Sequence, residues 1–233
     1  MTAAQPAASA TQGAAGAPTA SQVQNASAAS AAAAAPASGA SAAAPVERPL
    51  VQYRPQPLSM TVNGQSVGPM PVPAGIMMID FLHEYLGLTG SRLGCGQGIC
   101  HACVVIVDQP DGSSEEVRTC ITGAHFFDGR RVRTVEGHAK RNDAGDVVEL
   151  SPIQQKFLEH FSFQCGYCTP GFVNAATVLL ERLKLAPIAR ADVESVITEA
   201  LNPHLCRCTG YVRYYEAVKD LVLGTPGLVK DAA

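Results

Sequence analysis

The residues in this chain best suited to chemistry are its eight cysteines, which fall into two groups of four. Cys95, Cys100 and Cys103 form a C-x4-C-x2-C array, and Cys120 follows it. This is the plant-type spacing for a 2Fe-2S cluster, in which four thiolates hold the iron. The glycines around Cys95 permit the close backbone approach that a loop wrapped around an anionic cluster needs. The first group therefore predicts one 2Fe-2S cluster.

The second group pairs Cys165-x2-Cys168 with a later Cys206-x-Cys208. On spacing alone, two close cysteine pairs suit tetrahedral zinc as well as an iron–sulfur cluster. A thioredoxin-like dithiol in CGYC is a weaker alternative, because it leaves the second pair unexplained. Disulfides are disfavoured, because a C-x-C pair is a strained place for one. Zinc and iron–sulfur therefore both remain open for this group.

Other kinds of site find little support in the sequence. The chain has no C-x-x-C-H, so we expect any haem to lie on another subunit, and its six histidines form no H-E-x-x-H. His101, inside the first cysteine loop, is expected to be a supporting or surface residue. The net charge of −3 gives no basic surface for binding nucleic acid. The sequence contains no run of about 18 apolar residues, so we predict no membrane span. No catalytic constellation is visible, so we expect no substrate chemistry in this chain.

The sequence predicts that strands arranged around one helix position the first cysteine group. Apolar residues alternate from Leu58, and Asn63-Gly64 favours a tight hairpin turn. Apolar residues then recur at helical spacing over residues 76–87. Further strands are predicted at 104–107, just before Cys120, and at 131–135. This order predicts a ferredoxin-like β-grasp domain over residues 49–140.

After Gly137 the apolar period is helical throughout, which predicts an all-α domain of four helices over residues 141–233. Ser151-Pro152 and Thr169-Pro170 resemble helix starts, and Asp192 is expected to cap the next helix. The fold class is therefore α+β, with the β-grasp domain first. Residues 1–48 are a low-complexity, Ala-rich extension, expected to be disordered and without the features of an export signal.

Three motifs, GCGQGICHAC, FQCGYCTPGF and NPHLCRCTGY, together resemble the small iron–sulfur subunit of the xanthine oxidase family. The resemblance covers about residues 57–223. It implies an outer 2Fe-2S cluster on the first cysteine group and an inner one on Cys165, Cys168, Cys206 and Cys208. It also implies that Gln164, together with Cys208, lies on the side of a molybdopterin cofactor, with Gln164 hydrogen-bonded to the pterin.

The loop departs from the family pattern at Ile99 and His101, where glycines are usual, and the strands before Cys120 are more widely separated. These departures imply an environment and docking surface of the outer cluster that differ from the family's, with the same four ligands. The inner motifs follow the family pattern.

The same resemblance implies partners. The chain would serve a large molybdopterin-binding subunit and pass electrons from its molybdenum centre. Within the family it is most similar to membrane-bound aldehyde dehydrogenases of acetic acid bacteria, which implies aldehyde oxidation, a cytochrome c subunit, quinone and the periplasmic face of the inner membrane. The alternatives are a cytoplasmic purine or heteroaromatic hydroxylase with an FAD subunit, or a free-standing iron–sulfur carrier.

Overall fold

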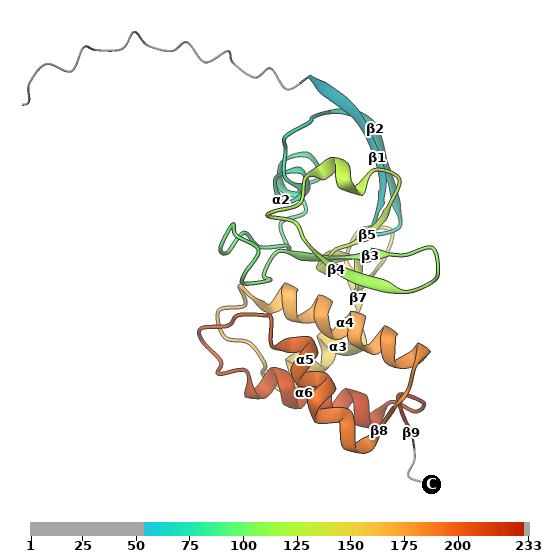
Figure 1. Ribbon diagram of the computed structural model, residues 1–233, viewed down its shortest axis with the longest axis vertical. Helices are drawn as coiled ribbons and strands as arrows, with labels where there is room; N and C mark the ends of the chain where they lie inside the picture. Colours follow the sequence, from blue (N-terminus) through green and yellow to red (C-terminus); the bar gives the residue numbers. More distant parts are fainter. Residues whose placement is uncertain (1–53, 231–233) are drawn as a thin grey trace, which may run out of the picture. The chain divides into compact units, whose positions relative to one another are not determined.

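The computed structural model describes residues 54–230, which form a sheet half (residues 54–149) followed by a helical half (residues 150–230) (Figure 1). The predicted low-complexity extension lies outside the described residues. Within residues 54–230, no helix combines the length and the apolar character needed to cross a membrane.

The sheet half opens with a hairpin of β1 (Pro55–Val62) and β2 (Gln65–Pro73). Its two-residue turn places Asn63 at φ 51° and Gly64 at φ 80°. Both central residues of a type I′ turn need positive φ, and Asn-Gly is the pair that adopts it at lowest cost. The structure thus confirms the hairpin predicted at this dipeptide.

Three more strands complete a five-stranded sheet of order β2-β1-β5-β3-β4, in which only β1 and β5 are parallel. They are β3 (Val104–Asp108), β4 (Ser114–Arg118) and β5 (Arg131–Arg133). Their buried faces meet Phe81 and Leu82 in one apolar cluster. This arrangement of a mixed sheet on one helical segment agrees with the predicted β-grasp.

The helical segment is less regular than its periodicity suggested. It begins as α2 (Met78–Asp80) and continues as the π-helix η1 (Phe81–Tyr85). The wider turn belongs to a segment whose Met78 and Phe81 are fully buried. Gly87 follows at φ 66°, as expected for a left-handed residue that ends a helix.

The prediction of helix throughout after Gly137 is wrong at its start. The 3-10 helix η3 (Val135–Gly137) is followed by a small hairpin of β6 (Lys140–Arg141) and β7 (Val147–Glu149). The Asn142 side chain accepts a hydrogen bond from the Asp146 amide, which closes the turn. A two-residue strand is too short for its alternation to show in the sequence.

The helical half contains four α-helices: α3 (Pro152–Glu159), α4 (Thr169–Leu185), α5 (Val193–Leu201) and α6 (Val212–Gly224). Their shared core includes stacked rings of Phe172 and Tyr214, with centroids 4.1 Å apart. The prediction of an all-α domain is wrong here too, because the parallel two-residue strands β8 (Ile188–Ala189) and β9 (Val229–Lys230), too short to show alternation in the sequence, pair within this half. Two short 3-10 helices remain, η2 (Ala124–Phe127) and η4 (Arg190–Asp192).

The predicted helix caps have mixed outcomes. Ser151 caps α3 in a full capping box with Gln154, as expected. Thr169 lies inside α4, where its hydroxyl pairs with that of Tyr214, and Cys168 is the N-cap. Asp192 precedes α5 but makes no side-chain cap, because η4 already continues into the helix there.

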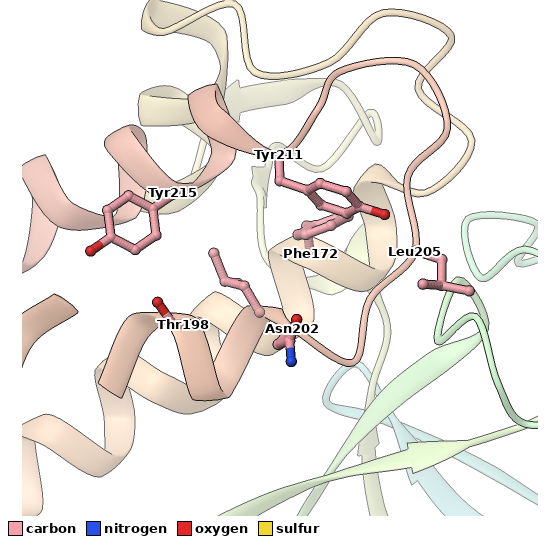
Figure 2. A pocket seen from close by; sticks show the side chains of 7 residues that line it. Phe172, Thr198, Asn202, Leu205, Tyr211 and Tyr215 are labelled. Atoms are coloured by element: carbon pink, nitrogen blue, oxygen red, sulfur yellow. The ribbon is translucent and has the colours of Figure 1, made fainter. Parts of the chain in front are cut away.

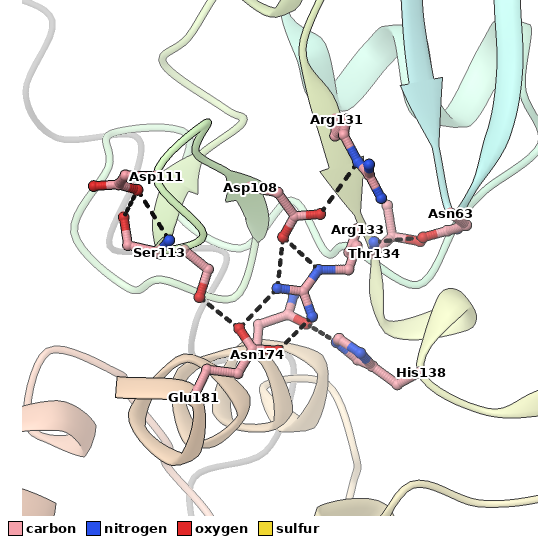
Figure 3. Close-up of polar contacts among 11 residues, drawn as sticks. Asn63, Asp108, Asp111, Ser113, Arg131, Arg133, Thr134, His138, Asn174 and Glu181 are labelled. Carbon is pink, nitrogen blue, oxygen red and sulfur yellow. Dashed lines mark hydrogen bonds and ion pairs between the residues drawn. The ribbon is translucent and has the colours of Figure 1, made fainter. Parts of the chain in front are cut away.

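Helix α4 lies against β3 and β4 and joins the two halves (Figure 1). Arg133 on β5 pairs with Asp108 and donates hydrogen bonds to Glu181 of α4 at 2.7 and 2.8 Å (Figure 3). Asn174 of α4, fully buried, donates to the Val104 carbonyl at 2.8 Å. These contacts fix the loops that carry the two cysteine groups relative to one another.

Candidate metal centres

The first cysteine group assembles on the loop before β3 and the turn after β4. The amides of Gln97, Ile99 and Cys100 each donate to Cys95 Sγ at 3.4 Å. The Thr119 hydroxyl donates to the buried Cys103 carbonyl at 2.7 Å, which holds the neighbouring Cys120 beside Cys103. All four predicted ligands of this group are therefore brought together.

The thiols of this group differ in acidity. Hydrogen bonds from the backbone amides of Cys100 and Gln97 lower the pKa of Cys95 to about 6. Burial, with a contribution from the Cys103 thiol, raises the pKa of Cys120 to about 11. Cys95 is therefore deprotonated more readily for metal binding than Cys100 or Cys120.

The second group assembles from the residues just before α4 and from the segment that leads into α6. Cys165 and Cys208 lie with their sulfur atoms 3.6 Å apart, and Cys168 lies beside Cys206. The Thr209 hydroxyl contacts Cys206 Sγ at 3.1 Å. All four predicted ligands of this group are likewise brought together.

A cavity of about 290 Å³ lies between the groups and is lined by six of the eight cysteines, namely Cys95, Cys100, Cys165, Cys168, Cys206 and Cys208. A single main-chain hydrogen bond, from the Leu205 amide to the Cys100 carbonyl at 3.1 Å, ties one cysteine loop to the other. The two groups are thus neighbours in one structure.

The donor sets fit iron–sulfur clusters. Each group supplies four thiols, and three amides already point at Cys95 Sγ, as hydrogen bonds to cluster sulfur require. At Gly94 a Cβ would come within 2.9 Å of Cys100 Sγ, so the loop has no room for a side chain there. Gly98 has a φ of 70°, which only glycine adopts easily. When bound, each 2Fe-2S cluster accepts one electron at a time.

A smaller pocket of about 240 Å³ borders the second group (Figure 2). Tyr211 lines it near Phe172, and its hydroxyl accepts a hydrogen bond from the Cys206 amide at 3.2 Å. Tyr211 holds a φ of 70°, so its backbone is strained where it supports this ligand loop. The pocket is mainly apolar, and the side chains that line it contain no thiol.

Gln164 is exposed next to the exposed Cys165, and Cys208 is exposed as well. By contrast, Cys103 is buried and Cys168 is half-buried. The predicted cofactor-side residues therefore share the accessible edge of the second group.

The sequence missed a third cluster of side chains. His101, Glu116 and His204 come together between the two cysteine loops. The two histidines stand inside cysteine motifs, which was the only signal, whereas Glu116 is indistinguishable from its neighbours on a strand.

Comparison with known proteins identifies both cysteine groups. Residues 60–126 match the model of a 2Fe-2S iron–sulfur cluster binding domain, and residues 134–219 match that of a [2Fe-2S] binding domain. The second match decides for iron–sulfur over zinc in the group that spacing had left open.

Similar proteins come from molybdenum oxidoreductases. The chain is 39% identical to the nicotine 6-hydroxylase small subunit of Paenarthrobacter nicotinovorans over 70% of its own length and 87% of that protein. It is 38% identical to the aldehyde oxidoreductase of Megalodesulfovibrio gigas, over 69% of this chain and 16% of that longer one. The crystal structure of quinoline 2-oxidoreductase from Pseudomonas putida aligns with a TM-score of 0.60 and 30% identity, over 75% of this chain and 94% of that one. The chain belongs to the iron–sulfur small subunits of the xanthine oxidase family of molybdenum oxidoreductases.

Proposed function

We propose that this chain carries electrons away from a substrate-oxidising molybdopterin subunit through two 2Fe-2S clusters held by its eight cysteines. In this proposal the outer cluster is bound by Cys95, Cys100, Cys103 and Cys120, and the inner one by Cys165, Cys168, Cys206 and Cys208. The observation that carries it is the gathering of the eight thiols into two sets of four, with six of the eight lining the cavity between the sets.

The accessible edge of the second group supports its assignment as the inner cluster, facing the large subunit. Gln164, Cys165 and Cys208 are exposed there, and nearby in sequence Phe161 and Val212 are 75% and 59% exposed. Large apolar side chains exposed together mark interaction surfaces. We place the pterin-binding partner on this edge, with the Gln164 amide as its hydrogen-bonding group.

The ligand assignment is tested by metal analysis and electron paramagnetic resonance of the reduced chain. We expect about four iron atoms per chain, by ligand count, and two distinct 2Fe-2S signals. Cys165→Ser should remove one signal and Cys120→Ser the other, so that each variant is the control for its counterpart. Zinc in place of iron, or loss of both signals in either variant, would contradict the assignment.

The partner edge is tested separately with Gln164→Ala in the complete complex. We expect turnover to fall while both iron–sulfur signals stay unchanged, because Gln164 supplies no sulfur ligand. Gln155→Ala, on the exposed surface of α3, is the matched control and should leave turnover unaffected. Equal turnover in the Gln164 variant and its control would remove Gln164 from the cofactor edge.

Two substrate classes have support. Aldehydes are supported by the identity to an aldehyde oxidoreductase. For this class we propose a cytochrome c subunit and quinone as acceptors, at the periplasmic face of the inner membrane. Nitrogen heteroaromatics are supported by the match to the nicotine 6-hydroxylase small subunit, which covers 87% of that protein. For this class we propose an FAD subunit and a cytoplasmic location.

Purification of the complex through a tag on this chain distinguishes the two classes. Membrane-bound haem that is reduced on addition of an aldehyde would support the first class. A soluble flavin complex that hydroxylates a heteroaromatic ring would support the second.

A further inference from the structure

Three polar side chains from distant segments converge between the two cysteine loops. His101 lies in the first loop, Glu116 on β4 and His204 in the turn before Cys206. One ligand atom from each lies within 4.8 Å of those of the other two. His204 Nε2 is 2.9 Å from a Glu116 carboxylate oxygen, and the two imidazole rings stand edge to face with centroids 5.1 Å apart.

The His204 ring is held in place by its surroundings. Only 1% of the residue is exposed, and its buried Nδ1 has no hydrogen-bond partner among the described residues. The ring packs on Phe172 at a centroid distance of 5.3 Å, and a Cβ at Gly171 would come within 3.1 Å of Nδ1. A ring confined in this way presents its nitrogens in fixed directions, as a ligand does.

A simpler interpretation is a histidine–carboxylate hydrogen bond that only ties the two halves together. It accounts for His204 and Glu116 but not for His101, which brings a third donor to the same place. His101 does so from a φ of 57°, a conformation that costs free energy in a non-glycine residue. Three convergent donors exceed what one hydrogen bond requires.

We propose that His101, Glu116 and His204 bind one divalent transition-metal ion of the zinc class, separate from both cysteine groups. Two imidazole nitrogens and one carboxylate oxygen are ligands that zinc favours, with a further position left for water. Two neutral imidazoles and one carboxylate give the set a charge of about −1, which attracts a dication.

The spacing of the donors allows this coordination. Ligand atoms at about 2.1 Å from a tetrahedral ion lie about 3.4 Å from one another. The three atoms lie within 4.8 Å, so the set must close by at most about 1.4 Å. The half-buried His101 side chain would turn inward, and the Glu116 and His204 ligand atoms, now 2.9 Å apart, would separate by about 0.5 Å. The bound ion would link both cysteine loops to β4.

The test uses the purified, iron-loaded chain, to which Zn²⁺ is added before desalting. We expect one retained zinc per chain with only nitrogen and oxygen neighbours in X-ray absorption, at about 2.0–2.1 Å, and no sulfur at about 2.3 Å. His101→Gly suits the positive φ, and Glu116→Gln keeps the size of the side chain. Each should weaken zinc binding at least tenfold, whereas His125→Ala, a histidine remote from the site, should not.

Circular dichroism and the iron–sulfur signals of each variant report whether it folds and loads iron normally. Failure to retain zinc in the parent chain would overturn the proposal. So would a shell containing sulfur, or equal zinc affinity in the parent and in a correctly folded Glu116→Gln chain. The cysteine assignment depends only on the iron measurements, so either proposal can fail without the other.

Discussion

Replacing Asn174 by leucine should separate the energetic contribution of the contact between the two halves from that of simple burial. The Asn174 side chain is fully buried and donates to the Val104 carbonyl at 2.8 Å. It also accepts from His138 Nε2 at 2.6 Å (Figure 3). Leucine has nearly the same volume, so it leaves no large cavity. It does remove the Asn174 partner of two polar groups, the Val104 carbonyl and His138 Nε2.

The expected cost follows from these two groups. A buried donor or acceptor that loses its partner costs about 1–3 kcal/mol, so the pair costs about 2–6 kcal/mol. Burial of the added apolar surface offsets about 1 kcal/mol of this, and we expect a net loss near 3 kcal/mol. For a chain of this size that corresponds to a fall in the thermal midpoint of about 6–12 °C.

Thermal unfolding of the iron-loaded protein, followed by circular dichroism at one fixed scan rate, provides the measurement. Gln155→Leu makes the same chemical change at an exposed position of α3 and should move the midpoint by less than about 2 °C. If Asn174→Leu lowers the midpoint no more than Gln155→Leu does, the buried hydrogen bonds contribute no net stability and the reasoning is refuted.

Three further outcomes are expected. In the chain stripped of iron, iodoacetamide at pH 7 should label Cys95 well before Cys120, because their pKa values lie near 6 and 11; equal labelling in mass spectrometry would contradict this. Burial lowers the pKa of His138 below its ordinary value, so the unfolded chain binds more protons and stability should fall as pH drops below about 6.5. His138→Gln should flatten that part of the profile of thermal midpoint against pH, and an unchanged slope would assign it to other groups. Gly98→Ala should weaken the outer iron–sulfur signal, since a φ of 70° disfavours any side chain and the end of the Ile121 side chain, 2.5 Å from the new Cβ, must move aside; a signal of full strength would contradict this.

Local signals in the sequence predicted much of the fold. Asn63-Gly64 specified its hairpin because few other dipeptides accept two positive φ values. Ser151 specified the start of α3 because its capping box satisfies amides that no other part of the helix can pair. In both cases the decisive contacts lie within three residues along the chain.

Features set by packing were predicted poorly. Thr169 could have capped α4, but the hydroxyl of Tyr214, 45 residues away, pairs with it instead. The π-helical turn at Phe81–Tyr85 likewise belongs to a segment buried under the sheet. Local propensity cannot anticipate a partner that only the tertiary fold brings near.

The same division applies to the site. Spacing predicted two sets of four cysteines, and the structure places the members of each set near one another, although the second set joins two pairs that are far apart in the sequence. It could not bring His204 to Glu116, 88 residues away, since that contact depends on how α4 seats against β3 and β4. A histidine within a ligand motif is a reasonable place to look for such convergence.

The hydrogen bond from the Leu205 amide to the Cys100 carbonyl provides a main-chain route for electronic coupling between the two cysteine sets. Leu205 precedes Cys206, so bonded main-chain atoms and one hydrogen bond connect a thiol of one set to a thiol of the other. This bridge contains no side-chain atom between the two cysteines. Electronic coupling along it would therefore survive almost any substitution at position 205. Proline, which has no amide hydrogen, is the one replacement that would cut the bridge.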